Sequence, residues 1–263
     1  MAEAFFWPAL LGYGEAALAY AWMRTSRAAT WGVRLGWLAQ TALLVVQAAR
    51  ADGFPWASWA GSLNLFVWLV VGAYLIWGCR PRFRLLGLAV MPLAVALFVV
   101  ARVGGGTGSG GRPHYGNLFL VLHVGLVLAA FAGFTLAAAL AGLYLWEERR
   151  LKRRAPDILR LRMPSLVVLE RLTTRTVAVS LPLLTLGLVA GFIRLANEGG
   201  GADAAMAAAV LAWAVYGAFL VVRPAGGQGA RLALLGFTLV ILVLAGFVLV
   251  AVVRLALPVT HFG

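Results

Sequence analysis

The sequence predicts an all-α protein, a polytopic integral membrane helical bundle of about eight transmembrane helices in one domain over residues 1–263. The first observation is composition. Hydrophobic residues make up 63% of the chain and charged residues 12%, which is too little polar surface to cover a water-soluble globule of this size. The second is that the apolar residues form long runs. In hydrocarbon such runs fold as helices, because each backbone amide needs a partner within its own segment, whereas a barrel would show short alternating strands.

Eight apolar runs have roughly the length that crosses about 30 Å of hydrocarbon. The fifth is longer than a bilayer requires, and we expect it to tilt or protrude. The first is interpreted as a span and not as a signal peptide, because no positively charged segment precedes it. The runs cover 4–22, 35–49, 60–78, 85–101, 117–146, 176–196, 204–222 and 232–257.

The distribution of Lys and Arg predicts the orientation. With both termini extracytoplasmic, every cytoplasmic loop is basic and 17 of the 22 Lys and Arg residues are cytoplasmic, as the positive-inside rule requires. We therefore expect a multi-pass protein of a bacterial inner (plasma) membrane. The residues left outside are Arg50, Arg102, Arg112, Arg194 and Arg254.

The net charge of +13 is explained by this topology. No soluble basic domain carries it, so nucleic acid is not an expected partner. The lone cysteine, Cys79, excludes an intramolecular disulfide and any site built from several cysteines.

The stretch from about 147 to 175 mixes nine basic residues with apolar ones. We interpret it as a cytoplasmic basic amphipathic segment that lies on anionic lipid. Docking of a cytoplasmic partner is the alternative.

The fifth run carries a face of small residues that recur every four positions. Such a face allows a neighbouring backbone to approach closely, so it should lie against another span. The adjacent face is expected to leave room for a flat ligand. The small residues are Gly125, Ala129, Gly133, Ala137 and Ala141, and the adjacent face consists of His123, Val127, Phe131 and Phe134.

Histidine is rare in this chain, and the predicted topology places all three copies on the outer side. His123 lies near the start of the fifth run, His261 follows the last run, and His114 lies in the glycine-rich loop before the fifth. Two imidazoles from different helices at one membrane face are what axial ligation of haem iron requires. The alternative is that His123 is a satisfied interfacial residue and His261 an exposed tail residue.

Four arginines at the outer ends of spans are candidate partners for haem propionates, although arginines at such positions also reach lipid phosphate when no ligand is bound. They are Arg50, Arg102, Arg194 and Arg254.

Glu15, inside the first run, is a candidate for haem or proton handling, because an intramembrane carboxylate is costly. No sequence motif of a known catalytic site is present, so we do not expect an enzyme.

Several stretches resemble the cytochrome c assembly protein family, the haem-handling CcsA/ResC/CcmC group, and within it the HemX-like branch. These are FPWASWAGSLNLFVWLVVGAYLIW, LHVGLVLAAFAGFTLAAALAGLYLWEERRLK, MPSLVVLERLTTRTVAVSLPLLTLGLVAGFIRLA and the closing LPVTHFG. The resemblance implies a b-type haem held by His123 and His261. The family's tryptophan-rich outer motif is missing: the corresponding loop, LANEGGGADAAMA, has no tryptophan.

Three functions remain open. The first is haem binding or haem transfer in cytochrome c biogenesis, with another assembly subunit as a partner beside the lipid bilayer. The second, implied by the HemX-like branch, is regulation of a haem-synthesis enzyme from the membrane. The third is small-molecule transport, for which no inverted repeat is visible.

Overall fold

The computed structural model describes residues 2–22, 27–50, 56, 58–77, 84–108, 118–153, 164–198, 204–222 and 228–237. Every regular element within these ranges is helical, as predicted. Residues 228–237 are helical as well. The named elements are η1 (Ala2–Phe5), α1 (Phe6–Ala21), α2 (Arg27–Arg50), α3 (Trp59–Trp77), α4 (Arg84–Val103), α5 (Leu118–Lys152), α6 (Leu166–Glu198) and α7 (Ala204–Val222).

Four of these helices, α3 to α6, are long and apolar enough to cross a membrane. They account for the third to sixth predicted spans. The shorter apolar helix Met206–Val222 matches the seventh. The total of eight spans and the outer position of both termini stay predictions, and most of the eighth span lies outside the described residues.

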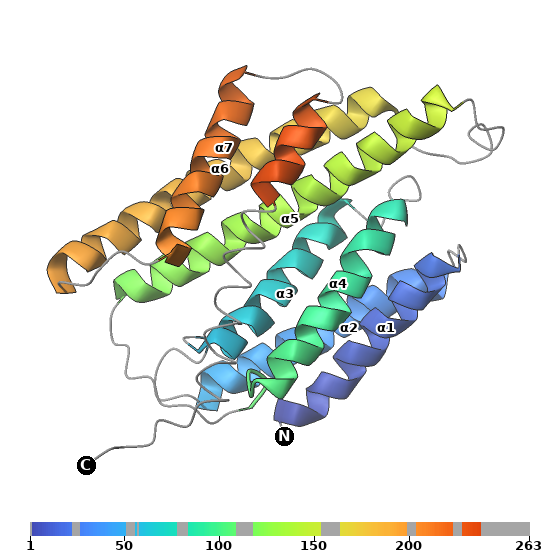
Figure 1. Cartoon of the computed structure of the whole chain (residues 1–263). Coiled ribbons are helices and arrows are strands. Elements are labelled where there is room, and N and C mark those ends of the chain that lie inside the picture. The colour runs from blue at the N-terminus through green and yellow to red at the C-terminus, as the bar shows by residue number, and fades with distance from the viewer. Residues whose placement is uncertain are drawn as a thin grey trace, which may run out of the picture.

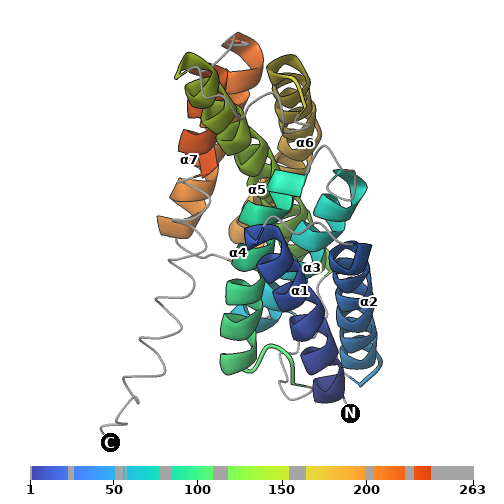
Figure 2. The same ribbon diagram turned by 90° about the vertical axis from the view of Figure 1, so that its right-hand side faces the viewer.

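The helices form two groups joined by α5 (Figures 1 and 2). Helices α1 to α4 pack on one another, α6 packs on α5 and α7, and α5 also contacts α3 and α4. Successive helices run in opposite directions. The last turns of α2, α4 and α6 therefore lie at the same end of the molecule as the first turns of α1, α3, α5 and α7 (Figure 1).

A chain of buried amides connects the first group. The Tyr13 hydroxyl of α1 donates to Gln40 Oε1 of α2 at 2.7 Å, and Gln40 Nε2 donates to Asn64 Oδ1 of α3 at 2.9 Å. Asn64 Nδ2 in turn donates to Gln47 Oε1 of α2 at 3.2 Å. All four side chains are buried. Because hydrocarbon offers polar groups no water, this chain satisfies them and cross-links three helices.

The same chain reaches the turn that ends α4. Gly105 has φ of +82°, Gly106 N–H donates to Ala101 O, and Gly105 N–H donates to Arg102 O, which is a Schellman C-cap. The turn directs the carbonyl oxygen of Gly106 toward α2 and α3, where it accepts hydrogen bonds from Gln47 Nε2 at 3.0 Å and Asn64 Nδ2 at 3.2 Å. All four helices of the first group are thereby joined through polar contacts.

The predicted amphipathic segment at 147–175 is bounded by two long helices. α5 continues to Lys152 and α6 begins at Leu166, so the flanks of the segment are helical turns that extend the spans. Residues 154–163 lie outside the described part, and association of the segment with lipid stays a prediction. Lys152 pairs with Glu148 at 2.7 Å, an exposed i,i+4 pair that adds little stability.

Replacing Asn64 with alanine should destabilise the first group of helices. The substitution leaves Gln40 and Gln47 buried with unmet hydrogen-bonding groups, at a cost of about 1–3 kcal/mol. Thermal or denaturant unfolding of the purified protein in detergent measures it. Asn197→Ala is the control, because that side chain is exposed at the end of α6. Equal stability of the two variants would contradict a structural role for the amide chain.

Candidate functional site

His123 lies in the second turn of α5 and reaches across to α6. Its Nδ1 is 2.6 Å from the carbonyl oxygen of Gly187, and the side chain is partly buried. A carbonyl oxygen can only accept, so Nδ1 carries the proton in this contact. In the neutral ring, Nε2 then has a free lone pair. A metal-binding histidine is commonly held in this way, with the second ring nitrogen donating to a backbone carbonyl.

Two glycines of α6 make room for this contact. A Cβ on Gly191 would lie 2.7 Å from Cε1 and 2.8 Å from Nδ1 of His123, closer than side chains tolerate. A Cβ on Gly187 would lie 2.7 Å from Val127 Cγ2. The Gly187-x-x-x-Gly191 spacing places both on one face of α6, where the two helices approach closely. This pair was not among the predicted site residues, although the four-residue spacing of the glycines was the signal.

The predicted small-residue face of α5 is confirmed for three of its five members. A Cβ on Gly133 would collide with the Ser180 side chain of α6, and Ala137 and Ala141 are fully buried. Ala129 is only partly buried. A Cβ on Gly125, in contrast, would meet no atom within 4 Å. Close packing therefore occurs in the middle of α5 through Gly133 and near its start through His123 and Val127.

The prediction of a free adjacent face on α5 is wrong for three of its four residues. Val127 packs against Gly187, and Phe134 stacks on Tyr216 of α7 with ring centroids 3.8 Å apart. Phe131 is also buried. The face is covered because α6 and α7 both pack beside α5, which apolar patterning on one helix does not reveal.

The three candidate arginines within the described residues lie in two places at the end of the molecule where α5 begins. Arg194 is partly buried on α6, one turn beyond Gly191 and hence near the His123 contact. Arg102, near the end of α4, lies over the Phe6 ring of α1 at 5.7 Å. Arg50 is the exposed last residue of α2. The structure thus groups Arg194 with His123, and Arg50 and Arg102 lie on the first group of helices.

His261 and Arg254 lie outside the described residues, as do His114, Arg112 and Cys79. The pairing of His123 with His261 therefore stays a prediction.

Glu15 is described: its exposed side chain lies on α1, and its Oε2 would be 3.5 Å from a Cβ on Gly32 of α2. α1 packs mainly on α2 and α4, so Glu15 is not brought to the His123 contact.

The sequence profile described as Cytochrome C assembly protein matches residues 56–253, about three quarters of the chain. The chain belongs to the cytochrome c assembly protein family. The match covers α3 to α7, including His123, Gly187 and Gly191. Membership in this family supports the assignment of the chain as a multi-pass membrane protein with a role in cytochrome c biogenesis, a process in which haem is handled.

Two relatives are similar over long stretches. Protein HemX of Brevibacillus brevis is 28% identical over 166 residues, which cover 60% of this chain and 58% of that protein. Cytochrome c biogenesis protein CcsA of Gloeothece citriformis is 25% identical over 267 aligned positions, which cover 80% of this chain and 81% of that protein. The family and the HemX-like resemblance predicted from the sequence are both supported.

The Gly133 contact predicts a substitution and its rescue. Gly133→Ala forces a methyl group onto Ser180, so the Ser180 hydroxyl must turn away and its Cβ, 3.0 Å from the new methyl group, must move back, and overpacking of this kind costs about 1–3 kcal/mol. The double variant Gly133→Ala with Ser180→Gly should recover most of the loss. Unfolding in detergent measures both, and Gly125→Ala, which meets open space, is the matched control. Failure of the double variant to recover would show that the contact does not limit the helix approach.

Proposed function

We propose that this protein binds and transfers haem in cytochrome c biogenesis, in a bacterial inner membrane and without catalysing a reaction itself. The observation that carries the proposal is the His123–Gly187 hydrogen bond, which leaves Nε2 available as a ligand. His261 is the proposed second ligand of a b-type haem. The bound haem would supply a redox-active iron, and the protein contributes its two imidazoles, their orientation and the surrounding cations.

The chemistry of the residues around His123 fits this cofactor. Gly191 allows the imidazole to lie close against α6, where the hydrogen bond to the Gly187 carbonyl oxygen orients the ring. Arg194, one turn further along α6, is the proposed partner of a haem propionate, because a guanidinium binds a carboxylate through two parallel hydrogen bonds. Arg50 and Arg102, on the first group of helices, and Arg254 are the other proposed partners.

Family membership and the CcsA similarity support the cytochrome c branch of this proposal. The HemX similarity favours one alternative, a membrane regulator of a haem-synthesis enzyme. The proposed partner is accordingly either another assembly subunit or that enzyme. Deleting the gene separates the two functions. Lost cytochrome c with normal haem precursors supports assembly, and altered precursors with normal cytochrome c support regulation.

Haem content tests the ligand assignment. Protein purified in detergent should show a Soret band, and His123→Ala and His261→Ala should each lose most of it. Gly191→Ala pushes the imidazole off α6 and should weaken haem affinity about tenfold or more, as loss of a supporting contact to a metal ligand does. Gly125→Ala, on the same helix as His123 and with open space for the added methyl group, is the control. Full haem content in both histidine variants would refute the ligand assignment.

A further inference from the structure

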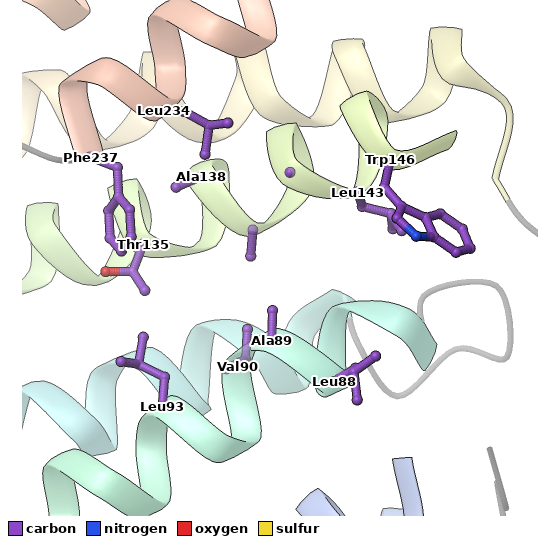
Figure 3. Close-up of a pocket in the computed structure, with 12 residues that line it drawn as sticks. Leu88, Ala89, Val90, Leu93, Thr135, Ala138, Leu143, Trp146, Leu234 and Phe237 are labelled. Carbon is purple, nitrogen blue, oxygen red and sulfur yellow. The ribbon is translucent and has the colours of Figure 1, made fainter. Parts of the chain in front are cut away.

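A second feature lies at the other end of α5, away from His123. A groove of about 550 Å³ runs between α4, α5 and the helix at 228–237 (Figure 3). The floor of the groove, which is its wall on α5, is recessed because the residues there are the small Ala138, Ala139 and Gly142. A Cβ on Gly142 would meet nothing within 4 Å. The other described lining residues are Leu88, Ala89, Val90, Leu93, Thr135, Leu143, Trp146, Leu234 and Phe237.

The lining fits a hydrocarbon chain and not a polar ligand. Thr135 is the one hydroxyl among the described lining residues, and it donates to the carbonyl oxygen of Phe131 at 2.8 Å in its own helix. From Thr135 to Trp146 the groove follows about 16 Å of helix, which is about half the hydrocarbon thickness of a bilayer. Its length is therefore that of one leaflet.

The two ends of the groove differ. Figure 3 shows Phe237, Thr135 and Leu93 at one end of the groove, and Trp146 and Leu88 at the opposite end. Leu88 is 40% exposed and Trp146 is 36% exposed, so the groove opens at that end. The open end is also the basic end of α5, where Arg149, Arg150 and Lys152 occupy the last turn.

Cations lie beside the open end. The Arg150 guanidinium sits over the Trp146 ring at 4.6 Å from its centroid, which holds a planar cation next to the mouth. Arg231 is exposed on the helix at 228–237, one turn before Leu234. It is close enough to α5 for its positive charge to stabilise the carboxylate of Glu148. An apolar slot with an arginine on each side complements an anionic head on a hydrocarbon chain.

We propose that this groove binds one acyl chain of an anionic phospholipid from the leaflet at the basic end of α5. The chain lies on Ala138, Ala139 and Gly142, and the headgroup phosphate is bound by Arg150 and Arg231. The site is separate from His123 and does not depend on haem binding. It would make occupancy of the groove sensitive to the anionic lipid content of the membrane.

Quenching of Trp146 fluorescence by brominated lipid tests the proposal. The protein is reconstituted in phosphatidylcholine vesicles that contain increasing fractions of brominated phosphatidylglycerol or brominated phosphatidylcholine. Subtracting the signal of Trp146→Phe isolates this tryptophan. We expect half-maximal quenching at about a fivefold lower fraction of phosphatidylglycerol, which corresponds to one favourable contact between a basic residue and an anionic headgroup. Equal quenching by the two lipids would overturn the proposal.

Two variants test the two parts of the site separately. Arg150→Gln should remove the preference for phosphatidylglycerol while both lipids still quench. Gly142→Leu should fill the floor and reduce quenching by both lipids, and Gly217→Leu on α7, where a Cβ also meets open space, is the matched control. A Trp146 shielded from both lipids in the unmodified protein would show that protein covers the groove, which also overturns the proposal.

Discussion

The close approach of α5 to α6 is the contact on which the candidate site depends. Lipid tails are as apolar as leucine, so apolar helices gain little from the hydrophobic effect when they associate inside a bilayer. What holds them is close packing and hydrogen bonding. In this protein the close packing requires glycines, because they have no side chain. Gly133 leaves room for Ser180, and Gly187 and Gly191 leave room for Val127 and His123. The position of the candidate ligand is thus a consequence of how two helices fit.

The two helical groups are stabilised by different means. Helices α1 to α4 are joined by the buried chain from Tyr13 through Gln40 and Asn64 to Gln47 and the turn after α4. Helices α5 to α7 rely on glycine contacts, on the stacking of Phe134 on Tyr216, and on a hydrogen bond from Trp213 to Thr185. A polar chain specifies one register, because a shift of any member leaves groups unpaired in a dry interior. Glycine packing specifies how near two helices come.

The length of α5 gives the molecule two chemically different ends. Its first turns bring a histidine against the backbone of α6, and its last turns carry cations beside an apolar groove. α5 also contacts α3 and α4, so it links the helical groups as well as the two membrane faces. The small residues of α5 serve two purposes: Gly133 packs against a helix, whereas Gly142 leaves the groove floor open.

The sequence alone determined the helical class, the membrane character and the family, because these follow from long apolar runs, the shortage of charge and extended stretches of similarity. It also singled out His123, since histidine is rare in this chain and a polar residue near the end of a span is conspicuous. Only the tertiary structure revealed that Gly187 and Gly191 hold its ring, that Gln40 and Gln47 belong to one polar chain, and that Val127 and Phe134 are covered. These facts depend on which helices become neighbours. Periodicity within one helix identifies a face but not the residue opposite it.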